Sequence, residues 1–130
     1  MPERKILVIE DEEDSAEFVR AVLEDEATSV AWARDGEAGL KAVRSERPDL
    51  IVLDVQMPKK DGFTVLVELR QDPETEGIPV VMLTGVAEAT GVRFSKSDVG
   101  DYIGVEPDAY VEKPVDPATL SSVVERLLGA

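Results

Sequence analysis

Acidic side chains stand directly behind two apolar runs of the chain. Glu10 and Asp11 follow the run at residues 6–9, and Asp54 follows the run at 50–53. If these runs are neighbouring strands of a parallel sheet, their carboxyl ends meet at one edge and the three carboxylates converge. Like charges at such distances repel strongly unless a cation neutralises them, and Mg²⁺ prefers oxygen ligands of this kind. The pattern predicts a Mg²⁺ site.

Two further residues at the same edge of the sheet could bind the oxygens of a phosphoryl group. Thr84 ends the run that begins at residue 78, and Lys113 closely follows the run at 109–111. A carboxylate beside a divalent ion can attack phosphorus and form an acyl phosphate. Lys113 could pair with one phosphoryl oxygen as a point charge, and Thr84 could donate its hydroxyl to another. This chemistry needs no histidine, and the chain contains none.

Each of these residues also has a purely structural interpretation. An acid after a strand commonly caps the next helix. Thr84 alone would be a strand-end hydroxyl, Lys113 alone a solvated charge, and Tyr110 a core aromatic with its hydroxyl at the rim. The functional interpretation is favoured because all of these groups fall at the same end of the same predicted sheet.

Short apolar runs alternate along the chain with segments of helical spacing. Asp35, Asp61 and Asp116 are placed to cap three of the expected helices, and Pro117 suits a first helical position. Residues 28–33 alternate in polarity, as in an edge strand. The alternation predicts an α/β fold in which helices cover both faces of a doubly wound parallel sheet. The expected strands are 6–9, 30–33, 50–53, 78–83 and 109–111.

Composition limits the classes of partner. Acids outnumber bases 28 to 14, a formal net charge of −14, which argues against binding to nucleic acid or to anionic membranes. Cysteine is absent, and no apolar run is long enough for a signal peptide or a membrane span. We therefore expect a soluble cytoplasmic protein with one domain over residues 1–130 and no output domain.

The motifs VIED, LDVQMPKKDG, VVMLTG and AYVEKP occur together in this order. In order and spacing the chain resembles, over essentially its whole length, the receiver domain of two-component response regulators. The resemblance implies a stand-alone CheY-like, flavodoxin-like fold with five strands in the order 2-1-3-4-5. It also implies a role in phosphorelay signal transduction, with a sensor histidine kinase or a histidine phosphotransfer protein as phosphodonor.

The resemblance assigns roles to the residues of the acidic edge. Asp54 would be the phosphoacceptor, Asp11 a direct Mg²⁺ ligand and Glu10 a ligand through water. The backbone carbonyl of Gln56 would complete the metal shell.

The resemblance also assigns the groups that respond to phosphorylation. Thr84 matches the switch hydroxyl, Lys113 the phosphate-pairing lysine, and Tyr110 the aromatic that turns inward on activation. The bond between Lys113 and Pro114 corresponds to the cis peptide bond of the family. Recognition of the kinase would involve the first helix, on which Phe18 and Ala21 are expected near the active-site loops.

One segment departs from the family pattern. More residues separate Thr84 from Lys113 than a receiver usually spends on its fourth helix, and glycines interrupt the expected helix. We expect a helix at 88–96 within an atypical or extended region of about 86–107, on the signalling face.

Three functions can be considered for this set of residues at the edge of the sheet. A phospho-accepting receiver that catalyses only its own phosphorylation and dephosphorylation is favoured because every functional position is filled. A pseudo-receiver that binds a partner without phosphorylation would be expected to lack Asp54, Asp11 or Lys113, and all three are present. A Mg²⁺-dependent phosphatase of the haloacid dehalogenase type also uses an aspartate nucleophile. It would need a second acid two residues on, where this chain has Gln56.

Overall fold

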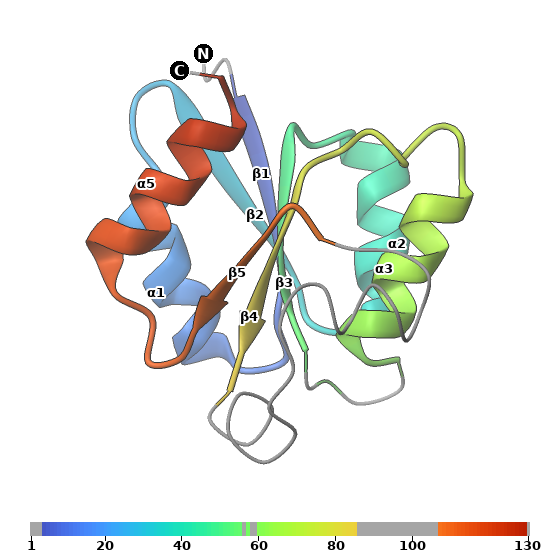
Figure 1. Cartoon of the computed structure of the whole chain (residues 1–130), viewed down its shortest axis with the longest axis horizontal. Coiled ribbons are helices and arrows are strands. Elements are labelled where there is room, and N and C mark those ends of the chain that lie inside the picture. Colours follow the sequence, from blue (N-terminus) through green and yellow to red (C-terminus); the bar gives the residue numbers. More distant parts are fainter. Residues whose placement is uncertain (1–3, 56, 58–59, 86–106, 130) are drawn as a thin grey trace.

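The computed structural model describes residues 4–55, 57, 60–85 and 107–129. Within these ranges strands and helices alternate along the chain as predicted, except that the residues between the last two strands are mostly outside the description (Figure 1). The strands are β1 (Arg4–Ile9), β2 (Thr28–Ala33), β3 (Leu50–Asp54), β4 (Val80–Thr84) and β5 (Ala109–Glu112). The helices are α1 (Glu13–Leu23), α2 (Gly36–Glu46), α3 (Gly62–Gln71) and α5 (Pro117–Leu127).

The five strands form one parallel sheet in the order β2-β1-β3-β4-β5, which confirms the predicted topology. β2 lies at an edge, as its alternating polarity indicated. The sequence placed the start of β4 two residues too early, at residue 78. Pro79 precedes the observed strand, and proline has no amide hydrogen to donate to a ladder. Thr84 is the last residue of β4, and Asp54 the last of β3.

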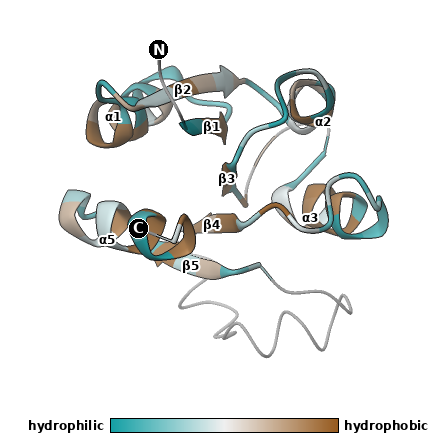
Figure 2. Ribbon diagram, turned by 90° about the horizontal axis from the view of Figure 1, so that it is seen from above, coloured by the Kyte–Doolittle hydropathy of each residue, from teal (hydrophilic) through white to brown (hydrophobic). Residues whose placement is uncertain are grey.

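Helices α1 and α5 cover one face of the sheet, and α2 and α3 cover the other (Figures 1 and 2). Successive strand residues feed two separate core clusters: Ile6 and Val8 belong to the cluster beneath α1 and α5, Leu7 and Ile9 to the one beneath α2 and α3. A central strand is therefore apolar at every position. This explains why β1 and β3 appear in the sequence as continuous apolar runs instead of alternating ones.

Three helices begin at the aspartates that the sequence singled out. The side chain of Asp35 accepts from the amide of Ala38 at 2.8 Å, and those of Asp61 and Asp116 accept from the amides of Thr64 and Thr119, each at 2.9 Å. These bonds satisfy amides that the helix itself leaves without partners. The predicted caps are confirmed.

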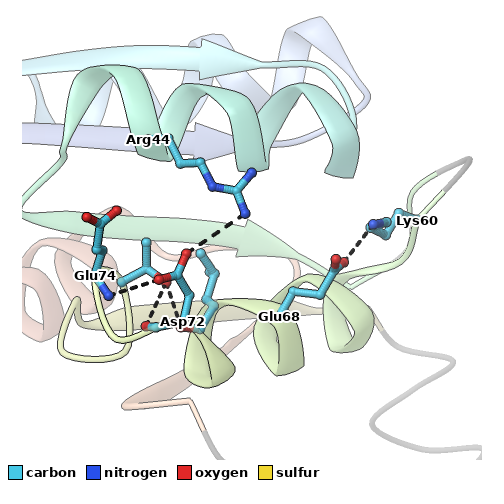
Figure 3. A network of polar contacts seen from close by, with 7 residues as sticks. Arg44, Lys60, Glu68, Asp72 and Glu74 are labelled. Carbon is cyan, nitrogen blue, oxygen red and sulfur yellow. Dashed lines mark hydrogen bonds and ion pairs between the residues drawn. The ribbon is translucent and has the colours of Figure 1, made fainter.

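Ion pairs fasten the outer elements to the sheet and to each other. Arg4 on β1 makes a two-pronged contact with Glu125 on α5, at 2.8 and 3.1 Å. On the other face, Lys60 pairs with Glu68 of α3 at 2.7 Å and thereby holds the segment that leads into this helix (Figure 3). The two hydrogen bonds between Arg4 and Glu125 fix the orientation of β1 relative to α5 better than a single contact would.

Some sequence predictions lie outside the described residues. They are the helix at 88–96 and the atypical character of the region around it, because the structure describes nothing from 86 to 106. In the part of the chain that is described, no helix is long and apolar enough to cross a membrane.

Gly39 lies in the interior of α2 and lets this helix approach β1 closely. A Cβ at this position would lie 2.6 Å from Cδ1 of the buried Ile9. We expect Gly39→Ala to lower the free energy of unfolding by about 1–3 kcal/mol, because overpacking outweighs the gain in helix propensity. Urea denaturation measures the change. Gly77→Ala is the matched control, since a Cβ there meets nothing within 4 Å. Equal stability of the Gly39 variant would contradict this account of the contact.

Candidate active site

The three acidic residues of the predicted site meet at the carboxyl edge of the sheet. β1 pairs with β3 so that Ile9 lies opposite Leu53, and the residues that follow are therefore adjacent. One carboxylate oxygen from each of Glu10, Asp11 and Asp54 lies within 4.8 Å of the others. The predicted convergence is confirmed.

These carboxylates are not helix caps. Asp61 caps α3, the helix that follows Asp54, and α1 begins behind Glu12 without a side-chain cap. The side chains of Glu10 and Asp54 are only 2% and 4% exposed, whereas Asp11 is exposed. Burying charge without a compensating partner is costly, so a fold that buries two neighbouring acids implies a cation.

Lys113 supplies one cation. Its Nζ lies 2.6 Å from Oδ1 of Asp54 and 3.9 Å from Oε1 of Glu10. The lysine follows β5, its amide donates to the carbonyl of Thr84 at 2.7 Å, and the Lys113–Pro114 peptide is cis, as expected. Partial burial acts to lower the pKa of the ammonium, but the hydrogen bond to Asp54 and the charges of Asp54 and Glu10 outweigh it and raise that pKa.

Lys113 alone does not compensate the buried carboxylate of Glu10. Neither of its carboxylate oxygens has a hydrogen-bond partner among the described residues. Burial raises the pKa of this carboxyl to about 8; the adjacent Asp54 adds to the rise, and the charge of Lys113 opposes it. Buried oxygens without donors, beside two more carboxylates, match the hard-oxygen donor set of a divalent cation. The residues present therefore fit Mg²⁺.

Strand alternation assigns the remaining site residues to the two faces of the sheet. Asp54 lies two residues after Val52 in β3, so its side chain is on the same face of the sheet, the face that α1 and α5 cover. Thr84 and Tyr110 share the parity of Met82, on the face of α3, where the half-buried Tyr110 packs against the core. Met82 lies opposite Tyr110 in the ladder, so Thr84 and Tyr110 are diagonal neighbours on adjacent strands.

The start of α3 packs directly behind the candidate phosphoacceptor. The amide of Gly62 donates to the carbonyl of Val55 at 2.8 Å, and a Cβ on Gly62 would collide with the carbonyl oxygen of Asp54. Glycine thus lets the helix approach closely enough to hold Asp54 in place. Gln56, whose carbonyl was predicted to bind the metal, lies outside the described residues.

Beside the acids lies an open cleft of about 320 Å³ between α1 and the segment that leads from β5 to α5. Glu10, Leu83 and Lys113 line this cleft, and Ser15 and Phe18 contribute to it from α1. Among the residues that line the cleft, Phe18 was predicted from the sequence, whereas Ser15 and Val115 were not. The spacing of residues 15, 18 and 19 places them on one helical face, but the facing loop could be located only from the fold. Ala21 does not line the cleft.

The sequence profile described as the response regulator receiver domain matches residues 6–125 of the chain. The chain belongs to this family. A relative, the alkaline phosphatase synthesis transcriptional regulatory protein PhoP of Bacillus subtilis, is 39% identical over 127 residues. The match covers 96% of this chain but 48% of PhoP, so the receiver spans about half the length of that relative.

Two further matches have nearly the length of this receiver. An uncharacterized 14.6 kDa protein of Leptolyngbya boryana is 34% identical, with 93% of this chain and 87% of that protein covered. The crystal structure of a putative response regulator from Chloroflexus aurantiacus superimposes with a TM-score of 0.84 at 29% identity and covers all of both chains. The receiver fold is thus matched throughout its length.

The raised pKa of Glu10 should make the stability of the metal-free receiver depend on pH. From its ordinary value of 4.5 up to about 8, the folded state keeps a proton that the unfolded state has lost. Raising the pH across this window therefore favours unfolding, by at most about 1.4 kcal/mol per pH unit for one proton. We expect the stability advantage of Glu10→Gln over the wild type to grow with pH between these values and then to level off.

Urea denaturation in EDTA at a series of pH values measures this difference. The comparison with Glu10→Gln cancels the general repulsion among the other acids of the chain. Parallel pH profiles for the two proteins would show that Glu10 does not titrate in this window.

Proposed function

We propose that Asp54 accepts a phosphoryl group, in a Mg²⁺-dependent reaction, from the phosphohistidine of a sensor histidine kinase or a histidine phosphotransfer protein. The observation that carries the proposal is the position of the Asp54 carboxylate. It is almost completely buried, touches Lys113 at 2.6 Å and lies within 4.8 Å of two further carboxylates. Membership of the receiver family supports the same assignment.

In the transfer step, an oxygen of Asp54 forms a bond to phosphorus while the phosphorus–nitrogen bond of the donor breaks. The electron pair of that bond stays with the imidazole. Glu10, Asp11 and Asp54 would hold Mg²⁺, which offsets the negative charge on the transferring group. Lys113 already neutralises Asp54 and is placed to pair with a phosphoryl oxygen once the acyl phosphate forms.

Thr84 and Tyr110 would convert the new charge into a change of shape. A phosphoryl oxygen attracts the hydroxyl of Thr84, and the movement of Thr84 leaves space for its diagonal neighbour Tyr110 to turn inward. Phosphorylation would thus shift the population between two packings of the face that includes β5.

The two alternative functions have less support. A pseudo-receiver would not need the Lys113–Asp54 contact, which is fully formed. A phosphatase would need a second catalytic acid, and the sequence has glutamine at position 56. We infer that the receiver turns over no small-molecule substrate and changes only its own phosphorylation state.

The cleft beside α1 is the candidate docking site for the phosphodonor. Phe18, at 40% exposure, is the exposed large hydrophobic side chain among the described residues, and it lines this cleft together with Glu10 and Lys113. A partner seated there would bring its phosphohistidine to Asp54. We infer a cytoplasmic phosphodonor and a protein target, without nucleic-acid contact by this strongly acidic chain.

The first test is intact-mass spectrometry after incubation with acetyl phosphate. We expect one phosphoryl adduct in the presence of Mg²⁺ and none in EDTA, because charge on the transferring group must be offset. Asp54→Asn should abolish the adduct, and Asp61→Asn, a helix-cap variant outside the acidic cluster, should retain it. An adduct that survives in Asp54→Asn would move the phosphoacceptor elsewhere.

A second test concerns docking. Phe18→Ala should slow transfer from a phosphorylated histidine kinase that recognises the wild-type receiver, by about ten-fold or more, because a buried aromatic anchor commonly contributes over 1.4 kcal/mol. The rate with acetyl phosphate should not change, since this small donor needs no docking surface. Ala21→Asp tests whether the contact extends along α1. Equal slowing with both donors would place the defect of Phe18→Ala in the fold.

A further inference from the structure

Trp32 contacts the backbone of the acidic site directly. Its indole Nε1 donates a hydrogen bond of 2.7 Å to the carbonyl oxygen of Glu10. The ladder between β1 and β2 ends where Ile9 lies opposite Ala33, one residue before Glu10. The Glu10 amide donates to the Ala33 carbonyl at 3.0 Å. Both backbone groups of Glu10 are therefore fixed to the edge strand, one of them by a side chain.

This restraint matters because the carboxylate of Glu10 has no hydrogen bond of its own among the described residues. Neither oxygen has a hydrogen-bond partner in the described ranges of the chain, and the Nζ of Lys113 is 3.9 Å away. The direction in which the carboxylate points is therefore set mainly by its own backbone and by packing. A contact that fixes the Glu10 peptide therefore limits where the carboxylate oxygens can lie.

The indole ring is itself held in place. Half-buried Trp32 packs against the core cluster beneath α1 and α5. The guanidinium carbon of Arg34 lies over the ring, 5.4 Å from its centroid, a cation–π geometry. The chain has a single tryptophan. A large aromatic side chain on an edge strand is thus stacked, packed and bonded so that its one donor reaches the metal-site residue.

We propose that Trp32 is a positioning residue for the Mg²⁺ site and sets the orientation of Glu10 through the indole hydrogen bond. This inference rests on the proposed Mg²⁺-dependent function. Groups that orient metal ligands from behind commonly change metal affinity by about 10–100-fold. Trp32 should therefore affect how tightly Mg²⁺ binds, not how fast the fully loaded receiver reacts.

The test is isothermal titration calorimetry of Mg²⁺ alone into the full chain, with Trp32→Phe beside the wild type. Phenylalanine keeps an aromatic ring beneath Arg34 but has no donor. We expect the Mg²⁺ Kd to rise about ten-fold. The rate of adduct formation from acetyl phosphate at saturating Mg²⁺ should stay at the wild-type value.

Two controls separate positioning from stability. Val123→Ala trims a side chain packed against the same core cluster and should lower stability without changing the Mg²⁺ Kd. Because the chain has one tryptophan, biosynthetic replacement by benzothienylalanine exchanges the indole N–H for sulfur and leaves the ring shape intact. This protein should show the same weakened Mg²⁺ binding as Trp32→Phe, even if that variant folds poorly.

The outcomes distinguish this inference from the function on which it rests. Wild-type Mg²⁺ affinity in both modified proteins, with Asp54 still phosphorylated, would overturn the role of Trp32 and leave the receiver function intact. Absence of Mg²⁺ binding by the wild type would overturn both. Weakened binding in Val123→Ala to the same degree would assign the effect to core stability and also overturn the proposal.

Discussion

Repulsion among buried carboxylates is the constraint around which this molecule is arranged. Glu10 and Asp54 are almost completely buried and share a small volume with Asp11. A flexible chain would separate them, but Glu10 directly follows β1 and Asp54 ends β3. The apolar side chains of these strands are buried on two faces, and the hydrophobic gain fixes the positions of the acids. The core thus holds together charges that would otherwise move apart. The Lys113 contact follows from that arrangement, and the same carboxylates could hold a divalent cation.

The sequence was sufficient to predict the sheet and the three acids because both depend on strong, local signals. Continuous apolar runs indicated strands buried on two faces, and three aspartates at the expected positions indicated helix starts. The order that makes strands one and three neighbours was implied by the resemblance to receiver domains, and with that order the geometry of a parallel sheet brings the acids together. The convergence of Glu10, Asp11 and Asp54 was therefore predictable before any coordinates.

Contacts between segments far apart in the chain were not predictable in this way. The cleft wall at Val115 depends on how the loop after β5 packs against α1, and the Trp32–Glu10 bond joins residues whose types give no sign of pairing. An alternating edge strand predicts that a tryptophan will be half-buried, but not where its one donor will point. The start of β4 was misplaced because Ile78 is apolar although Pro79 interrupts the ladder.

The alternation of side chains across the sheet divides the molecule into two compartments. Asp54 and the cleft share the face of α1 and α5, whereas Thr84 and Tyr110 face the α3 side. The two faces meet at the carboxyl edge of the sheet, where Thr84 follows Leu83, the ladder partner of Asp54. Substitutions in the cleft beside α1 would therefore alter the surface of one face while leaving the packing of Tyr110 against the core of the other face in place.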